Sequence, residues 1–201
     1  MALVTLASPW AETAENINYF DPMDVFELEW ASDPQVSSDG ETIVYVRKSN
    51  DIMKDRVRSN LWRIAKDGID HRPLHSGFKN SYSPRWSPDN ERIAFVSNNS
   101  GSVQIHMHWV DTGETAVISQ IQESPSSLSW SPDGKWLAFT MRVKAETISL
   151  TKERDKPDGA SWAKKPITVT NTRYQYDGRG IVEPSYRHIF VVPAEGGSAR
   201  Q

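Results

Sequence analysis

Three segments of the sequence align with one another without gaps, and this repeat restricts the possible folds more than any other feature. The segments are PQVSSDGETIVYV (34–46), PRWSPDNERIAFV (84–96) and LSWSPDGKWLAFT (128–140). Their turn aspartates, Asp39, Asp89 and Asp133, lie 50 and 44 residues apart. A period of about 40–50 residues is typical of propeller blades or of helical arrays.

The residues around each aspartate favour strands over helices. Each aspartate is followed by glycine or asparagine, which adopt the positive φ of a tight hairpin turn. An apolar run rich in β-branched or aromatic residues comes next, at 43–46, 93–96 and 136–139. A strand that is apolar on both faces is covered on both sides, so we expect these runs to lie between neighbouring blades.

A second pair of strand candidates completes each unit. The runs at 61–64, 103–110 and 188–192 each lead into a turn that contains glycine. Two hairpins per unit make a four-stranded blade. We therefore predict an all-β chain, folded as a β-propeller of four-stranded blades at about 31–77, 78–122 and 123–201. A closed ring needs at least about four blades, so three units predict an incomplete ring and a fragment of a longer protein.

Two segments do not fit the repeat. In DPMDVFELEW (21–30), Asp21 stands as a possible N-cap before a run of apolar residues, which predicts a short helix. The third unit carries an insertion at about 143–187, between its second and third strands. The first half of the insertion contains KERDKPDG and is expected to be a charged surface loop. The second half, ITVTNTRYQYDGRG, alternates like a strand and ends in a glycine turn.

Composition excludes several classes of function. The formal net charge is −3, which gives no basic field for nucleic acid. No apolar run approaches the roughly 18 residues that span a bilayer. Cysteine is absent, which excludes disulfides, thiolate metal sites and a cysteine nucleophile. The start, MALVTLA, is similar to the tail of a secretory signal. We interpret 1–20 as a signal-peptide remnant or a disordered start, and expect a periplasmic or secreted protein, with a cytoplasmic one as the alternative.

The histidines, aspartates and tryptophans of the repeat have structural and functional interpretations. His106 and His108 lie two apart on a predicted strand and face one way; a metal pair needs a third ligand, so a polar strand face is favoured. The repeat aspartates are expected to form turns rather than a catalytic site. Trp86 and Trp130 occupy matched positions, and with Trp62 they are expected to pack in the core or between blades.

The repeats resemble those of a known family. SSDGETIVYVR, SPDNERIAFVSN and SPDGKWLAFTM are similar to the WD40-like propeller repeats of the prolyl oligopeptidase family of serine peptidases. The opening segment DPMDVFELEWASDPQVSSDG, and RYQYDGRG followed by HIFVVPAEGGSARQ, are similar to the acylaminoacyl-peptidase and dipeptidyl-aminopeptidase-like branch. The resemblance runs from about Asp21 to Gln201.

This resemblance implies a function for a larger protein. In that family an α/β-hydrolase domain follows the propeller and holds the catalytic serine, aspartate and histidine. The present sequence contains no G-x-S-x-G nucleophile elbow. The resemblance therefore implies an N-terminal propeller without catalytic residues or a cofactor, which gates the access of peptide substrates to the hydrolase domain. The alternative is a non-enzymatic, TolB-like periplasmic scaffold that binds proteins, because TolB-type propellers share the S-P-D-G repeat.

The repeat does not explain the residues Tyr176, Asp177 and Arg179 of the insertion. In the functional interpretation this loop reaches the hydrolase domain or the path of the substrate, where Arg179 pairs with a substrate carboxylate and Asp177 with an amine. The structural interpretation is a hairpin turn with solvated charges, which is the commoner use of such loops. Both interpretations stay open from the sequence.

Overall fold

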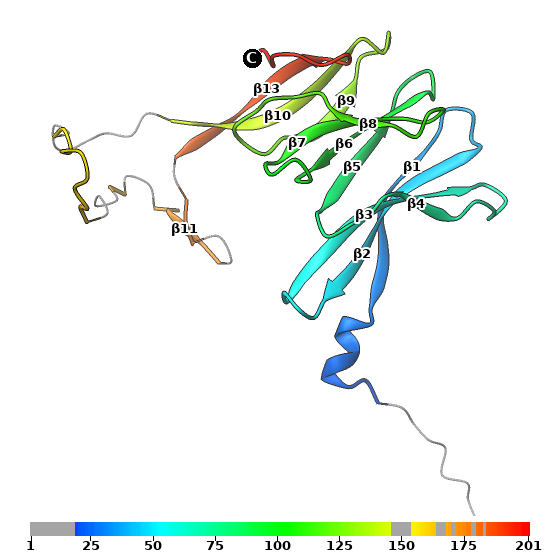
Figure 1. Ribbon diagram of the computed structural model, residues 1–201, viewed down its shortest axis with the longest axis horizontal. Coiled ribbons are helices and arrows are strands. Elements are labelled where there is room, and N and C mark those ends of the chain that lie inside the picture. The colour runs from blue at the N-terminus through cyan, green and yellow to red at the C-terminus, as the bar shows by residue number, and fades with distance from the viewer. Residues whose placement is uncertain (1–18, 146–153, 164–167, 170–171, 178–179, 183) are drawn as a thin grey trace, which may run out of the picture.

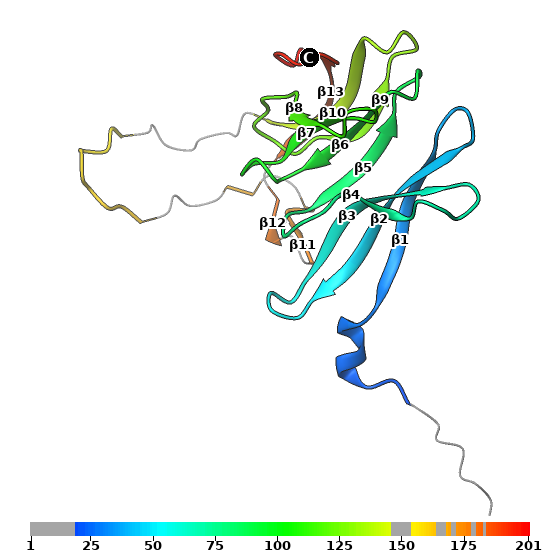
Figure 2. The same ribbon diagram turned by 45° about the vertical axis from the view of Figure 1, so that its right-hand side comes forward.

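The computed structural model describes residues 19–145, 154–163, 168–169, 172–177, 180–182 and 184–201. These residues form three successive antiparallel sheets that are arranged like blades, preceded by one short 3-10 helix (Figures 1 and 2). The predicted all-β architecture, an incomplete propeller of four-stranded blades, is confirmed.

The first two blades are complete four-stranded meanders. The first contains β1 (Glu29–Val36), β2 (Thr42–Asp51), β3 (Arg56–Ala65) and β4 (Arg72–His75), side by side in that order. The second repeats this order with β5 (Ser81–Trp86), β6 (Arg92–Ser97), β7 (Gln104–Trp109) and β8 (Thr115–Val117). The meander follows from the two hairpins that each unit encodes.

The third blade contains the insertion. Its strands β9 (Ser126–Trp130), β10 (Trp136–Lys144) and β13 (Ser185–Pro193) form a sheet in the order β13-β10-β9, and a bridge from Val191 to Arg200 starts a fourth position. The insertion leaves between β10 and β13, as predicted. It carries a small separate hairpin of β11 (Gln175–Tyr176) and β12 (Gly180–Ile181), which lies apart from the blades in the view of Figure 1.

The predicted opening helix is shorter and tighter than expected. A 3-10 helix covers only Pro22–Phe26, with Asp21 as its N-cap in a capping box with Asp24. Trp30, which we assigned to the helix, lies in β1 and pairs with Lys48. The correction has a physical reason, because pairing with the long strand β2 supplies a ladder of hydrogen bonds that an isolated turn of helix lacks.

The first strand of each blade is bent at the same place. Asp33, Ser83 and Ser127 have φ values of 49°, 55° and 56°, and the pairing register shifts beside each of them. A residue with positive φ in a strand is the mark of a bulge, which increases the local twist. The strand β5 contacts both β1 and β9, so the three bent strands lie next to one another along the inner edge.

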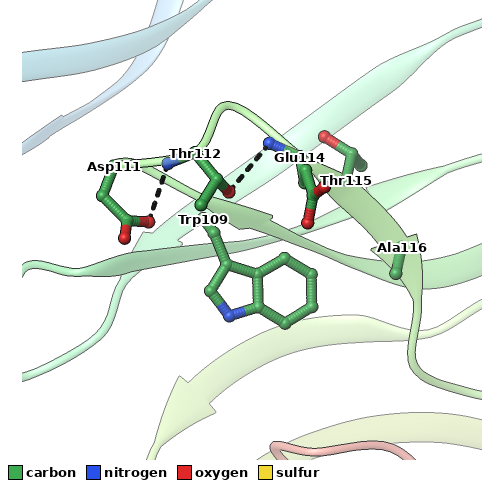
Figure 3. A pocket seen from close by; sticks show the side chains of 6 residues that line it. All are labelled: Trp109, Asp111, Thr112, Glu114, Thr115 and Ala116. Atoms are coloured by element: carbon green, nitrogen blue, oxygen red, sulfur yellow. Dashed lines mark hydrogen bonds between the residues drawn. The ribbon is translucent and has the colours of Figure 1, made fainter.

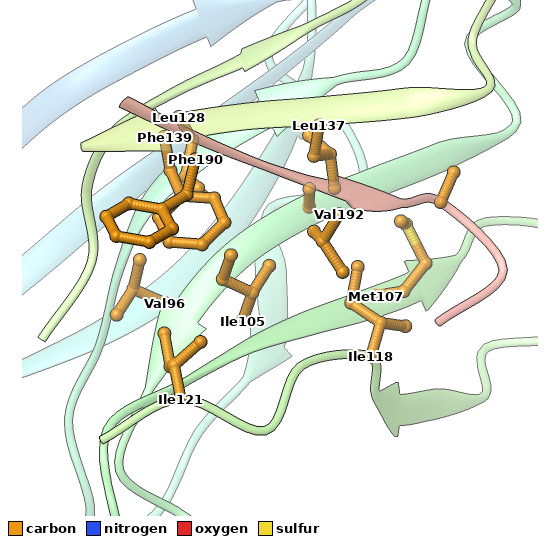
Figure 4. Packing of buried hydrophobic residues seen from close by; sticks show 12 residues of the cluster. Val96, Ile105, Met107, Ile118, Ile121, Leu128, Leu137, Phe139, Phe190 and Val192 are labelled. Atoms are coloured by element: carbon orange, nitrogen blue, oxygen red, sulfur yellow. The ribbon is translucent and has the colours of Figure 1, made fainter. Parts of the chain in front are cut away.

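The main hydrophobic core lies between the second and third blades (Figure 4). Val96 and Ile105 of the second blade face Phe139 and Phe190 of the third, and all four are at most 8% exposed. The two phenylalanine rings stack with centroids 5.8 Å apart. The strand β6 is buried on both faces, as its apolar sequence predicted.

Two tryptophans join successive blades by the same hydrogen bond. The Trp86 indole N–H donates to the carbonyl oxygen of Gln35 at 3.1 Å, and the Trp130 indole donates to that of Arg85 at 3.0 Å. Gln35 and Arg85 occupy matched positions beside the bulges of β1 and β5. The predicted inter-blade role of these two tryptophans is confirmed. Trp62 differs, because it packs under Arg47 and beside His71 on a face of the first blade rather than in a blade-to-blade core.

We expect Trp130→Phe to lower the free energy of unfolding by about 1 kcal/mol beyond its packing cost, because the Arg85 carbonyl loses its donor. Trp109→Phe is the matched control, because that partly buried indole packs on the same core but donates no hydrogen bond to the described residues. Urea denaturation of the two variants measures the difference. Equal destabilisation would show that the hydrogen bond contributes nothing.

Candidate functional site

Each repeat turn is closed by the same three side-chain hydrogen bonds. A serine hydroxyl donates to aspartate Oδ1 at 2.5 Å in all three turns, namely Ser37–Asp39, Ser87–Asp89 and Ser131–Asp133. The same Oδ1 accepts the backbone N–H two residues further on at 3.0–3.1 Å. The serine oxygen in turn accepts an N–H from the start of the next strand at 2.9–3.0 Å. The three aspartates are therefore turn residues, as predicted.

These hydrogen bonds lower the pKa of the three carboxyl groups. For Asp39 and Asp133 the serine hydroxyl is the largest cause, followed by the backbone N–H. For Asp89 the largest effect is burial, which raises the pKa, but the hydrogen bonds and the charge of Arg92 outweigh it. A lowered carboxyl pKa keeps these side chains ionised as acceptors, which suits a turn and not a general acid.

An ion pair that the sequence analysis did not identify lies on the inner strands. Arg85 Nη1 of β5 is 3.0 Å from Asp33 Oδ2 of β1, and Gln35 Nε2 donates to Asp33 Oδ1 at 2.9 Å. Both charged side chains are about 30% exposed. The pair links the first strands of the first two blades. The aligned repeats contain a hint of this ion pair, because the second unit has the charged Arg85 where the other two have the uncharged Gln35 and Ser129.

The structure places two of the three predicted site residues in the insertion hairpin. Tyr176 ends β11 and pairs with Gly180, and its side chain is 49% exposed. Asp177 follows it in the turn and is also exposed. Arg179 lies outside the described residues. No hydrogen bond or ion pair joins Tyr176 or Asp177 to another described side chain, so their substrate-binding role stays a prediction.

The histidines of β7 share a polar face of the strand, as predicted, and that face is buried. His106 and His108 are 4% and 5% exposed because the first blade covers this side of the second. Among the described residues, no group of three or more histidine, aspartate or glutamate side chains is placed to hold a metal ion. Within the same residues, no helix is long and apolar enough to cross a membrane.

A surface pocket lies at the turn between β7 and β8 (Figure 3). Its polar groups are already used within the turn, where Asp111 Oδ1 accepts from the Thr112 N–H at 2.8 Å and Thr112 Oγ1 from the Glu114 N–H at 3.3 Å. The indole of Trp109 forms its floor. The pocket is at the outer end of the blade, away from the inner strands, and these contacts describe a turn rather than a site for chemistry.

The family model described as the TolB beta propeller domain matches residues 42–201. An uncharacterized peptidase, YuxL, of Bacillus subtilis is 29% identical over 180 residues, covering 89% of this chain and 27% of the relative. Dipeptidyl-peptidase 5 of Porphyromonas gingivalis is 31% identical over 134 residues, covering 66% of this chain and 20% of the relative.

Solved structures show the same fold. The acylaminoacyl peptidase of Pyrococcus horikoshii superposes with a TM-score of 0.63 at 17% identity, over 88% of this chain and 25% of that one. The chain thus spans about a quarter or less of the length of these three proteins. These matches confirm the expected likeness to peptidase propellers.

We expect Asp133→Asn to lower the urea midpoint at pH 7, because a neutral amide is a weaker acceptor for the Ser131 hydroxyl and the Lys135 N–H. The folded carboxyl pKa lies below the usual 3.8, so the stabilisation is present above that pH and is lost as the pH falls through the folded value. The difference in urea midpoint between D133N and the parent protein should therefore be smaller at pH 3 than at pH 7.

The control for this experiment is Glu123→Gln, which changes an exposed carboxylate that makes no hydrogen bond to the described residues. It should leave the midpoint unchanged at each pH. A D133N gap of the same size at pH 7 and pH 3 would contradict the role of the ionised turn carboxylate.

Proposed function

The chain belongs to the TolB β-propeller domain family, and from this premise we propose that it is the propeller of a serine-type oligopeptidase that gates the access of peptides to a hydrolase domain. The observation that carries the proposal is the match of nearly the whole chain to about a quarter of peptidase YuxL. The remaining length of such a relative provides room for a catalytic domain. The partners in this proposal are peptide substrates and that hydrolase domain.

The mechanism follows from the geometry of a propeller. In this proposal the hydrolase domain supplies the serine that attacks the peptide carbonyl, and the propeller covers it. In the closed propeller of this proposal, the bent first strands would border the axial channel, which would put the Asp33–Arg85 pair at its wall. A channel of this kind admits an extended peptide and excludes a folded protein, and it keeps bulk water from the reacting groups. Selection by size is the contribution of the propeller.

The insertion is proposed to contact the substrate. Its hairpin lies shortly before β13, apart from the sheets in the view of Figure 1, and exposes Tyr176 and Asp177. An exposed carboxylate beside an aromatic ring suits the ammonium group of a peptide N-terminus, and Arg179 is proposed to meet a carboxylate. Loops held on a rigid scaffold commonly carry such roles.

A second candidate is a non-enzymatic scaffold that binds proteins, and the family model favours it because its description is that of a TolB propeller. The two candidates differ in one measurable property, since only the first predicts covalent labelling by a serine-directed reagent. An exported protein suits both candidates, and we propose a periplasmic or secreted location. The mass of the mature N-terminus from the native source tests it: removal of the first residues supports export, and an intact start argues against it.

We expect the complete gene product that carries this chain to hydrolyse short chromogenic peptides and to lose the activity after treatment with a fluorophosphonate. The 201-residue chain alone should be inactive, because its sequence has no nucleophile elbow. Peptides of increasing length and a folded protein are compared as substrates. Turnover by the 201-residue chain, or equal rates for short peptides and a folded protein, would contradict the proposal.

In the same gene product, Asp177→Asn should raise the KM for peptides with a free N-terminus by about tenfold, the effect of losing one charge-assisted hydrogen bond. N-acetylated peptides should be unaffected, which separates recognition from a folding defect. Asp155→Asn is the matched control, because Asp155 is an exposed aspartate in the other half of the insertion. Equal effects on free and acetylated peptides would refute the role of Asp177.

A further inference from the structure

The joint between the first and second blades is built differently from the joint between the second and third. Its buried apolar cluster consists of Val46, Leu61 and Phe95, whereas the second joint has a cluster of twelve buried residues. The positions that hold Phe190 and Val192 in the third blade hold His106 and His108 in the second. Imidazole therefore takes the place of hydrocarbon at this one joint.

Two imidazoles lie against a phenylalanine in this joint, and a third, His108, is buried on the same face of β7 as His106. The ring of Phe95 lies between His75 of β4 and His106 of β7, with centroid distances of 5.1 and 5.4 Å. The centroids of His75 and His106 are 6.4 Å apart, across the boundary between the two blades. Because the rings come from different blades, a change in their charge acts directly on the contact between the blades.

The imidazoles have few acceptors. His75 Nδ1 lies 2.8 Å from the Ser81 hydroxyl and His108 Nδ1 lies 3.0 Å from that of Thr115. His106 Nε2 is buried without a hydrogen-bond partner. In the part of the chain that the structure describes, no carboxylate lies within 4.0 Å of any of the three rings. A protonated imidazole has two N–H donors, so protonation here creates donors and charge that the closed joint does not match.

The other titratable groups around the rings do not supply a counter-charge. Arg63 of β3 and Arg72 of β4 are cations, and both already pair with Asp70, at 3.0 and 2.6 Å. Tyr82 of β5 is neutral, since burial raises its pKa. The nearby side chains of β6 and β8, namely Phe95, Ser97 and Thr115, are uncharged. A proton taken up at the joint is therefore repelled by the positive charges of Arg63 and Arg72.

We propose that the joint between the first and second blades is a pH-sensitive hinge, which loosens on acidification when His75, His106 and His108 become protonated. The second joint contains no histidine in its buried cluster and stays closed under the same conditions. Acidification thus acts on one boundary of the propeller and not on the next one.

The pKa values of the histidines determine whether acid favours the closed or the open joint. Burial lowers the pKa of all three histidines. The charges of His75, Arg63 and Arg72 lower the pKa of His108 further, and for His106 burial and the charge of His75 outweigh a backbone hydrogen bond with Ser97 that raises its pKa. The open joint therefore binds more protons than the closed one. The closed form is fully favoured above the free histidine pKa of about 6.5 and loses stability as the pH falls below it. Each proton taken up on opening shifts the equilibrium by up to about tenfold per pH unit.

The test uses two valines that the repeat makes equivalent. Val46 faces the first joint and Val96 the second; Val46 pairs with Leu61 as Val96 pairs with Ile105, and the two are 1% and 0% exposed. The chain has no cysteine, so V46C and V96C each introduce a single buried thiol of similar size. The rate at which a dipyridyl disulfide, a reagent that also reacts in acid, labels each thiol is measured from pH 8 to pH 5. Each rate is divided by the rate for a free thiol at the same pH, which gives a corrected labelling rate.

We expect the corrected labelling rate of V46C to rise by about tenfold or more between pH 6.5 and pH 5.5, while that of V96C stays within about twofold. Global unfolding would raise both rates together, and a parallel rise would overturn the proposal. Replacing the two histidines by their counterparts in the third blade, H106F with H108V, should remove the acid-dependent rise in V46C. If that variant lacks native circular dichroism at pH 8, H75Q with H106Q and H108Q replaces it, and an acid-dependent rise that persists without the three imidazoles overturns the proposal.

Discussion

The hydrogen bond from serine to aspartate in each repeat turn sets the register of the first two strands, and the burial pattern of the blades depends on that register. Side chains alternate between the two faces of a strand, so a slip by one residue would exchange the buried and the exposed sets. The turn fixes the residue at which the second strand begins, because the serine oxygen binds the N–H of Thr42, Arg92 or Trp136. The buried valines and phenylalanines then face the neighbouring blades.

Register within a blade does not by itself hold two blades together. That contact depends on the bulge of the inner strand, which turns a backbone carbonyl toward the next blade, where a tryptophan indole reaches it. Arg92 adds a second link, since it donates to the Gly134 carbonyl at 3.1 Å and to Glu195 at 2.9 Å. The hydrogen bonds at the edges of a joint orient the two blades, and the buried apolar side chains at its centre hold them together.

The sequence was sufficient for features that depend on local chemistry. The turns, the second strands, the place of the insertion and the packing of Trp86 and Trp130 were predicted because a repeat shows which positions are equivalent. It was insufficient where the environment comes from another blade. The burial of His106, the exposure of Trp62 and the pairing of Arg85 with Asp33 depend on what the neighbouring blade presents. The predicted extent of the opening helix was wrong for a different reason, because pairing with β2 of the same blade decides where β1 begins.

The differences among equivalent positions carry the functional information, because the shared residues serve the fold alone. Where the third blade has Phe190, the second has His106 and the first has Trp62. The packing of a phenylalanine against the next blade does not depend on pH, whereas an imidazole packs favourably there only while it is neutral. Trp62 lies on the opposite face of the first blade from Leu61, where it packs under Arg47. The two joints therefore differ in how their contact responds to pH, and motion is expected first at the joint that contains the imidazoles.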